Sequence, residues 1–438
     1  MHETRSHSIF EFDILLFFSV LLLTIVGILF IYSSGVTSTG IVFSSEYVRQ
    51  IIWAGIGLLL MLTVAFTDYR VYRDVAVYLF VAMLLLLVIT LLFGRVVNGA
   101  RRWLGLWQFG IQPSEFAKLA FILVVAKYLD YVANGIRKLP TFVLGMLLVI
   151  PPTLLIAVQP DLGTAAVFFP LYIVMAFVAG AKASHVGFFI LSGVCVLLFT
   201  LLPTYEQFVL ERHSPLISVL SESGPVTILL ASLVLVVLLA IIGRVVTKRR
   251  WFTAIAYGVS IPALGVAASV FVRGFLRPYQ LMRLVVFLDP SIDPRGAGWN
   301  TIQSVTAVGS GGVWGKGFLQ GTQSHFQYLP QQSTDFIFSI IAEEWGFIGA
   351  FGIFILFFLI LLRAVLILGY AKDAFGAYVA AGVAGMIFTH FVVNIGMAMG
   401  ILPITGLPLF FLSYGGSTLW TGMIGVGLLL SVYNRKYR

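Results

Sequence analysis

The strongest constraint in this sequence is a series of long apolar runs, because about 20 apolar residues in a helix are enough to cross a membrane. Twelve such runs occur, near 10–32, 48–66, 75–93, 114–132, 141–158, 162–180, 186–202, 226–246, 252–273, 336–367, 376–399 and 417–433. The chain is 60% hydrophobic and 10% charged, whereas soluble domains carry about 25% charged residues. Helices satisfy their own backbone hydrogen bonds in a bilayer. We therefore predict an all-α polytopic membrane protein with about twelve transmembrane helices.

The basic residues predict the topology. An even number of spans places both termini on one side of the membrane. If that side is cytoplasmic, the inward stretches hold fifteen of the 27 Lys and Arg residues and the outward stretches hold ten, with Lys118 and Lys127 inside a run. The positive-inside rule favours this orientation. We predict a multi-pass inner-membrane protein with both termini in the cytoplasm, and we attribute the net charge of +9 to topology and anionic lipid, not to nucleic-acid binding.

The outward basic residues are clustered in 95–102 and 273–316. This clustering predicts an anionic ligand outside the membrane; the alternative is that these side chains extend to lipid phosphates without a specific role. The single cysteine, Cys195, excludes a disulfide framework or a Cys-based metal site. The histidines show no ligand spacing, so we predict no protein metal site.

Residues 274–335 are the one long stretch without a spanning run, and loops of this length are usually functional. The PYQLMRLVVFLDP segment is amphipathic and suits the membrane interface. The glycines of GSGG and GKG flank Lys316 and predict either an anion cradle or a plain flexible loop.

The loop ends in Ser333-Thr334-Asp335 before an apolar run. Ser333 or Thr334 is expected to cap the helix, which places Asp335 in its first turn. There Asp335 either complements the helix dipole or acts as a general base at the membrane boundary. Glu115 and Lys118 are three residues apart and share a helix face, as a functional pair or as a structural ion pair.

Other polar residues lie at membrane depth. Asp161 ends one run, and Ser339 and Glu343 follow Asp335 at four-residue spacing. His390 and Asn394, four residues apart, favour interhelical hydrogen bonds over metal binding.

Several motifs then identify a family resemblance. They are NGARRWLGLWQFGIQPSEFAKL at 98–119, QPDLGT at 159–164, FLDPSIDPRGAGWNTIQS at 287–304, AVGSGGVWGKGF at 307–318, LPQQSTDFIFSIIAEEWGFIG at 329–349 and NIGMAMGILPITGLPLFFLSYGGST at 394–418. The chain resembles the SEDS proteins (shape, elongation, division and sporulation), which include RodA and FtsW. Gly321-Thr322-Gln323 is more similar to the RodA branch, which works in cell elongation.

The resemblance implies that the chain polymerises lipid II into glycan strands at the outer face. It also implies a class B penicillin-binding protein as the partner that crosslinks them, and other elongation-complex membrane proteins as further partners. The family's essential acidic residue falls on Asp335, which we predict as the catalytic base. We predict these substrate-binding residues: Arg49, Arg101, Arg102, Trp103, Glu115, Lys118, Gln303, Ser304 and Lys316.

The chemistry of glycosyl transfer fits these residues. A base must take the proton of the acceptor 4-hydroxyl as it attacks the anomeric carbon, and inversion there needs no covalent intermediate. Arg49, Arg101, Arg102 or Lys118 is expected to offset the charge on the departing pyrophosphate. A divalent cation, Mg or Mn, bound with that pyrophosphate is the one cofactor that we consider.

The chain departs from the family in three places. Gln331 and Ser333 stand where Glu and often His are usual, and Phe410 stands where Pro is common. The family has about ten spans, so we expect a ten-helix core plus an extra pair, with an insertion at approximately 203–250. We otherwise predict one domain, 1–438, that includes the large extracytoplasmic loop 274–335. The alternative functions are a lipid II flippase and a non-catalytic scaffold for the penicillin-binding protein.

Overall fold

The computed structural model describes residues 12–97, 100–105, 110–209, 215–276 and 278–436. Its helices and strands are α1 (Ile14–Ser34), α2 (Glu46–Phe66), α3 (Tyr69–Phe93), β1 (Arg95–Val97), β2 (Ala100–Trp103), α4 (Pro113–Val132), η1 (Ala133–Arg137), α5 (Leu139–Met146), η2 (Leu147–Val149), α6 (Ile150–Val158), α7 (Leu162–Val178), α8 (Ala183–Val209), α9 (Pro215–Ser221), α10 (Ser223–Thr247), α11 (Trp251–Phe275), α12 (Pro278–Leu288), η3 (Pro290–Ile292), α13 (Trp299–Ser310), α14 (Thr322–His325), α15 (Ile337–Tyr370), α16 (Ala374–Ala398) and α17 (Gly416–Asn434). The chain forms two compact units, which are described separately: unit 1 is 1–181 with 303–438, and unit 2 is 182–302.

The helices follow the predicted apolar runs. Each of the twelve runs is helical, with 141–158 divided among α5, η2 and α6. Within the described residues, ten helices are long and apolar enough to cross a membrane. The other two runs form α4, which carries Glu115, Lys118, Lys127 and Asp130, and α7, which has 17 residues. The all-α polytopic prediction is confirmed, while the count of twelve spans and the single domain with an insertion at 203–250 stay predictions.

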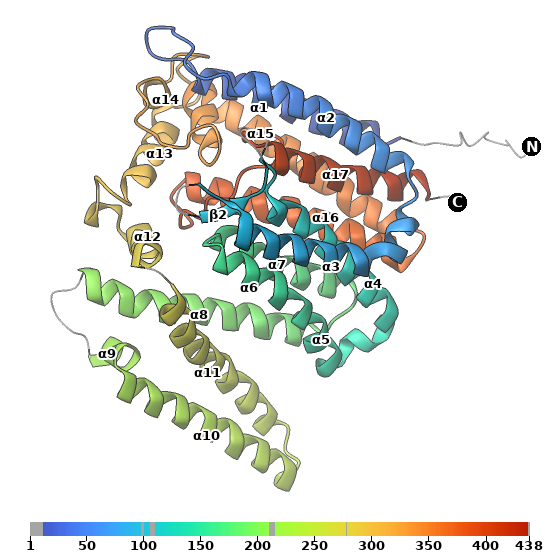
Figure 1. The fold of residues 1–438 in the computed structure, drawn as a ribbon. Coiled ribbons are helices and arrows are strands. Elements are labelled where there is room, and N and C mark those ends of the chain that lie inside the picture. Colours follow the sequence, from blue (N-terminus) through green and yellow to red (C-terminus); the bar gives the residue numbers. More distant parts are fainter. Residues whose placement is uncertain (1–11, 98–99, 106–109, 210–214, 277, 437–438) are drawn as a thin grey trace, which may run out of the picture. The chain divides into compact units, whose positions relative to one another are not determined.

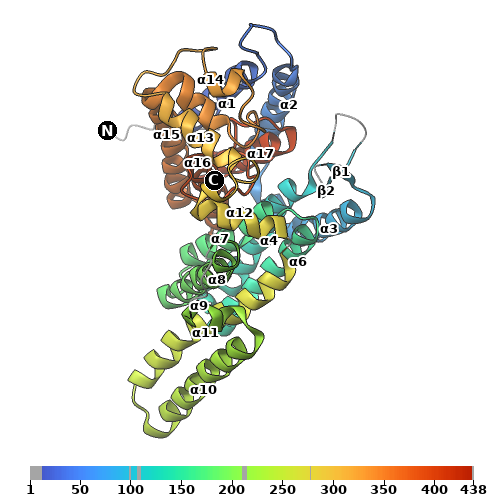
Figure 2. The same ribbon diagram turned by 90° about the vertical axis from the view of Figure 1, so that its left-hand side faces the viewer.

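The centre of unit 1 is formed by α16 and α17. Helix α16 packs against α4, α7, α15 and α17, and α17 packs along α2 (Figures 1 and 2). Most of α16 and α17 is buried, whereas little of α2 and α3 is buried and both carry exposed apolar side chains of the kind that contact lipid. Intramembrane polar groups on α16 are therefore enclosed by protein.

Aspartates at helix starts hold unit 1 together. Asp13 caps α1 by accepting from Leu16 N (3.1 Å), and its other oxygen binds Arg363 Nε of α15 (2.7 Å). Asp373 likewise accepts from Gly376 N (2.7 Å) at the start of α16 and from the Tyr69 hydroxyl (2.7 Å). An N-cap satisfies an otherwise unpaired backbone N–H, so each aspartate both begins a helix and ties it to another.

Helix α15 is interrupted at Gly346, whose φ of +63° and ψ of −158° are not helical. The glycine-rich segment after α13 closes this break: Lys316 N and Gly317 N donate to the carbonyls of Glu343 (3.0 Å) and Glu344 (2.9 Å). A Cβ at Gly346 would lie 2.3 Å from Gly315 N. The backbone N–H groups of Lys316 and Gly317 are therefore used within the fold, and an anion cradle formed by the other glycines of GSGG and GKG stays a prediction.

Unit 2 is built on α8, α10 and α11, with α11 packed against both other helices and α12 against α8. A small core of Leu220, Val226 and Val266 joins them. The predicted amphipathic segment is helical as α12, with Val285 and Val286 buried and Leu288 exposed. The predicted long loop 274–335 thus contains helices α12, η3, α13 and α14 within its described residues.

Candidate functional site

Asp335 lies in a turn before α15. The Gln331 carbonyl accepts from Asp335 N (3.0 Å) and Thr334 N (3.3 Å), and Gln331 has a φ of +53°. Helix α15 begins at Ile337, with Phe336 as N-cap and no side-chain cap. The prediction that Ser333 or Thr334 caps the helix and Asp335 lies in its first turn was wrong, because the turn centred on Gln331 engages these N–H groups first.

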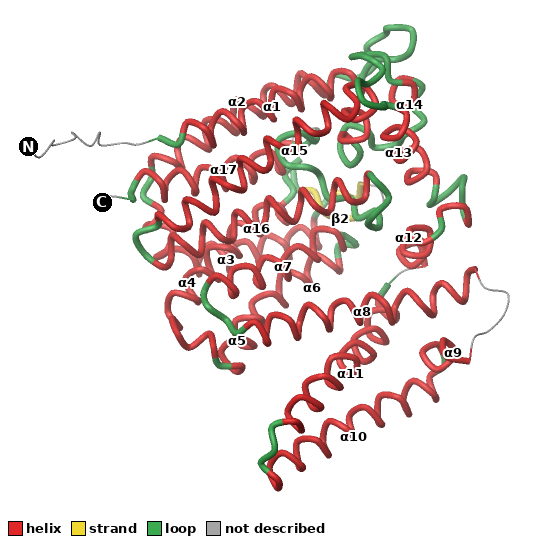
Figure 3. Tube along the Cα trace, turned by 180° about the vertical axis from the view of Figure 1, so that it is seen from behind, coloured by secondary structure: helices red, strands yellow, loops and turns green. Residues whose placement is uncertain are grey.

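The 399–415 segment, which joins α16 to α17 without regular structure, faces this turn. Asn394 Nδ2 donates to the backbone carbonyls of Asp335 (2.9 Å) and Leu407 (2.8 Å). A Cβ added at Gly406, where φ is +73°, would lie 3.5 Å from Asp335 Oδ2. The half-buried Asp335 is therefore held between α16 and a glycine that leaves room beside its carboxyl group. In Figure 3, loops and strand β2 gather at the same end of unit 1, away from both termini.

A fully buried charged pair lies behind this segment. Lys118 Nζ is 2.9 Å from Glu115 Oε1 and 2.9 Å from His390 Nε2. His390 Nδ1 contacts the Pro408 carbonyl at 2.8 Å, and a carbonyl only accepts, so Nδ1 carries the proton and Nε2 accepts from Lys118. The predicted helix-face pairing of Glu115 and Lys118 and the interhelical hydrogen bond of His390 are confirmed, whereas Asn394 bonds to carbonyls outside the helices.

Two consecutive carbonyls link the buried pair to Asp335. His390 and Asn394 are one turn apart on α16, and they bind the neighbouring carbonyls of Pro408 and Leu407. The Lys118 side chain is therefore connected through His390 to the 399–415 segment, which faces Asp335. Low-dielectric surroundings make such fully buried polar networks rigid.

A second charged cluster joins β2 to the same segment. Asp161 accepts from Gln112 Nε2 (3.0 Å) and lies 3.6 Å from Arg102 Nη1. At the start of α7, a Cβ on Gly163 would lie 2.3 Å from the Thr405 carbonyl, so this helix abuts the 399–415 segment. The sequence analysis named Arg102 and Asp161 separately and did not name Gln112. The one feature that could have indicated Gln112 is its position directly before Pro113 at the start of a helix.

The remaining predicted arginines and Trp103 lie around this cluster. Arg49 is half-buried on α2. Burial of the Tyr414 side chain raises the pKa of Tyr414, and the positive charge of Arg49 opposes that rise. Tyr414 N donates to the Ser333 carbonyl (2.8 Å), which brings Arg49 toward the Asp335 turn. Arg101 is exposed and donates to the Leu92 carbonyl (3.4 Å), and Trp103 is half-buried on β2.

Three predicted residues belong to the loop region. Ser304 is fully buried, bonded to Ser339 Oγ (2.7 Å) and donating to the Ala398 carbonyl (2.7 Å). Gln303 is half-buried on α13. Lys316 Nζ forms an ion pair with Glu343 Oε1 (2.7 Å). These bonds give Ser304 and Lys316 clear roles in the fold, and their contact with a substrate stays a prediction.

Glu343 and Glu344 anchor the loop to the membrane helices. Both side chains are fully buried. Glu343 accepts from the backbone of Thr322 (2.8 Å) and Gln323 (2.9 Å), and Glu344 accepts from Ser33 Oγ of α1 (2.5 Å). His325 completes the anchor, with Nδ1 2.7 Å from the Val36 carbonyl and Nε2 3.2 Å from Glu344 Oε1.

We expect the His325–Glu344 interaction to weaken as the pH rises above 6.5. Its hydrogen-bonded Glu344 neighbour raises the pKa of His325 above the ordinary value of 6.5, although burial opposes the shift. A raised folded-state pKa contributes stability below the unfolded value, and that stability is lost as pH rises through the folded value. Thermal unfolding in detergent should therefore show a midpoint that falls as pH rises above 6.5. His325→Gln should lose this component; an unchanged pH profile in the variant would contradict the assignment.

An apolar cavity of ≈ 350 Å³ opens beside the first turns of α15. It is lined by Val308, Gly312, Phe338, Phe347, Phe351 and Met399, among others. Phe338 is three residues after Asp335 in the chain, so a long apolar group beside α15 would lie near a polar group at Asp335. Among the described residues, no group of three or more His, Cys, Asp or Glu side chains is placed to hold a metal ion.

The fold and this site define a multi-pass α-helical membrane protein with charged groups enclosed near one membrane face. A family model described as cell cycle protein, FtsW/RodA/SpoVE, matches residues 13–223 and 214–438. The chain belongs to this family, which is the SEDS family that its motifs resemble.

Similar proteins cover nearly the whole chain. Peptidoglycan glycosyltransferase RodA of Treponema pallidum (strain Nichols) is 46% identical over 432 residues, which cover 99% of this chain and 100% of that protein. Peptidoglycan glycosyltransferase MrdB of Escherichia coli (strain K12) is 34% identical over 390 residues, covering 89% and 85%.

Solved structures agree with these relatives. A chain from a peptidoglycan synthase complex, described as coordinating polymerization and crosslinking, has a TM-score of 0.64 and 30% identity, covering 98% of this chain and 99% of that one. The rod shape determining protein RodA of Thermus thermophilus has a TM-score of 0.60 and 26% identity, covering 98% of each chain.

Proposed function

We propose that this chain, a peptidoglycan glycosyltransferase like its relatives, polymerises lipid II into glycan strands at the outer face of the inner membrane during cell elongation. The observation that carries the proposal is the placement of Asp335. Its backbone is fixed by Asn394, its carboxyl group lies beside Gly406, and a buried cation supports the opposing segment. This arrangement suits a base held in place at a membrane boundary.

Asp335 takes the proton from the acceptor 4-hydroxyl as that oxygen attacks the anomeric carbon of the donor. The new glycosidic bond forms as the bond to undecaprenyl pyrophosphate breaks, with inversion and no covalent enzyme intermediate. Charge grows on the departing pyrophosphate, and positioned cations stabilise such charge. Arg49 and Arg102 are half-buried and Arg101 is exposed, so each is a candidate for this role.

The other predicted substrate-binding residues complete the proposal. Trp103 lies on the same strand as Arg101 and Arg102, and Gln303, Ser304 and Lys316 line the loop side. Glu115 and Lys118 act from behind the 399–415 segment. The apolar cavity beside α15 suits the isoprenoid chain of lipid II. A Mg or Mn ion bound with the pyrophosphate belongs to the proposal and would assist the same cations.

A class B penicillin-binding protein is the proposed partner, and other elongation-complex membrane proteins join it. Support comes from the similar chain in a complex described as coordinating polymerization and crosslinking. The start of α1 and the end of α17 lie at one end of unit 1 and helix α14 lies at the other (Figure 1), which supports cytoplasmic termini with catalysis outside.

The test is synthesis from purified components. The protein, alone and with its partner, receives lipid II in detergent, and the products are separated by length on a gel. We expect glycan strands. Transfer of lipid II across liposomes without any polymer would identify a flippase instead, and neither activity, with stimulation of crosslinking by the partner, would identify a scaffold.

A further inference from the structure

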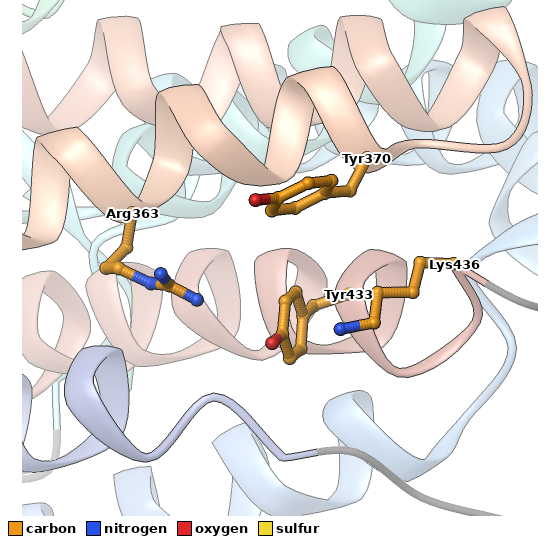
Figure 4. A pocket seen from close by; sticks show the side chains of 4 residues that line it. All are labelled: Arg363, Tyr370, Tyr433 and Lys436. Carbon is orange, nitrogen blue, oxygen red and sulfur yellow. The ribbon is translucent and has the colours of Figure 1, made fainter. Parts of the chain in front are cut away.

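A second pocket lies at the end of unit 1 that holds the start of α1 and the end of α17, at the far end of α15 from Asp335. It has a volume of ≈ 240 Å³ and is lined by Arg363, Tyr370, Tyr433 and Lys436 (Figure 4). Arg363 and Tyr370 come from α15, Tyr433 from α17, and Lys436 from just beyond α17. The proposed transferase chemistry uses none of these residues.

The lining of this pocket suits an anion. Asp13 Oδ2 binds Arg363 Nε (2.7 Å) and Nη2 (2.6 Å), which fixes the guanidinium, and its central carbon lies 5.6 Å from the centre of the Tyr433 ring at the pocket wall. Lys436 Nζ lies 4.0 Å from the centre of the Tyr433 ring, which holds this ammonium group at the pocket wall. Two phenol groups add hydroxyl donors. Charge-assisted hydrogen bonds from such groups are the strong contacts of bound phosphates.

The surface beside the pocket suits acyl chains. Leu362, Leu366 and Tyr370 follow at four-residue spacing, so they share one face of α15. They are exposed by 39%, 36% and 49%. On a membrane-spanning helix, this face contacts lipid tails. The cationic pocket thus lies beside an apolar face of α15. This arrangement matches a lipid, which has a phosphate headgroup and apolar tails, better than it matches a free ion.

We propose that this pocket binds the phosphate headgroup of an anionic phospholipid from the leaflet on the side of both termini, with its acyl chains along the Leu362–Leu366 face of α15. The bound lipid links α15 to α17 directly and to α1 through the Arg363–Asp13 pair. Anionic lipid at a cytoplasmic surface attracts basic residues, and the pocket adds specific contacts to that attraction. The proposal does not depend on the glycosyltransferase activity.

The test is native mass spectrometry of the full chain in detergent with added phosphatidylglycerol or phosphatidylcholine. Wild type should retain one phosphatidylglycerol in preference to phosphatidylcholine. Lys436→Gln should weaken that binding about tenfold, because it removes one charge-assisted hydrogen bond. The matched control is Lys372→Gln, which removes an exposed cation on the same side outside the pocket and should bind as wild type does.

Arg363 is a poorer probe, because its loss also breaks the Asp13 pair and could disturb α1. Tyr433→Leu therefore serves as the second variant, with binding weakened and the unfolding midpoint unchanged. Equal retention of phosphatidylglycerol by Lys436→Gln, Tyr433→Leu and wild type would overturn the site. Displacement of the lipid by inorganic phosphate alone would overturn the lipid assignment and leave a site for free phosphate.

Discussion

Replacing Asp335 with Asn is expected to abolish the polymerisation of lipid II. General-base catalysis contributes about 10²- to 10⁴-fold to a reaction rate, and Asn is nearly the same size as Asp but cannot take the proton. The backbone carbonyl of residue 335 keeps its bond from Asn394, so the turn should be retained. The measurement is the initial rate of glycan formation from lipid II, with the partner protein present.

The control variant is Asp289→Asn, which changes a half-buried aspartate that belongs to the same 274–335 region and caps η3. We expect polymerisation near the wild-type rate from this control. Asp335→Asn should also unfold near the wild-type midpoint, which separates lost chemistry from lost folding. Strand synthesis by Asp335→Asn at the wild-type rate would rule out Asp335 as the base.

The helices of this protein could be predicted from the sequence because a bilayer demands long apolar runs whatever the tertiary structure is. The pairing of Glu115 with Lys118 could be predicted for a similar reason, since both residues lie on one helix and helical spacing alone brings them together. His390 and Asn394 could be recognised as hydrogen-bonding residues, because polar groups inside a membrane protein require partners.

The partners themselves could not be predicted. Pro408 and Leu407 offer their carbonyls from a segment without regular structure, and no periodicity describes such a segment. The sequence placed Lys316 either in an anion cradle or in a plain loop, and its ion pair with Glu343, 27 residues away, could not be predicted. The start of α15 was misplaced because a left-handed Gln331 is not apparent in a sequence. The hydrogen-bond partners and the start of α15 therefore depend on tertiary contacts, which local sequence patterns do not specify.

Replacing Lys118 with Met is expected to destabilise the protein by about 3–5 kcal/mol, because breaking a buried ion pair leaves the other charge uncompensated. Glu115 would then be enclosed with no cation, and one of its oxygens, Oε2, already lacks a hydrogen-bond partner in the described structure. His390 Nε2 would also lose its donor. The unfolding midpoint in detergent measures the loss.

The double variant Glu115→Gln/Lys118→Met should recover most of that stability, since it removes both charges together and replaced buried pairs are often neutral. Lys118 is fully buried. Within the described residues, its hydrogen bond to His390 and the bond from His390 to the 399–415 segment connect it to the Asp335 region. We therefore expect polymerisation to recover in part with folding. A double variant as stable as wild type but without any polymerisation would instead show that Lys118 acts on the substrate itself, as its place among the predicted pyrophosphate-binding cations implies.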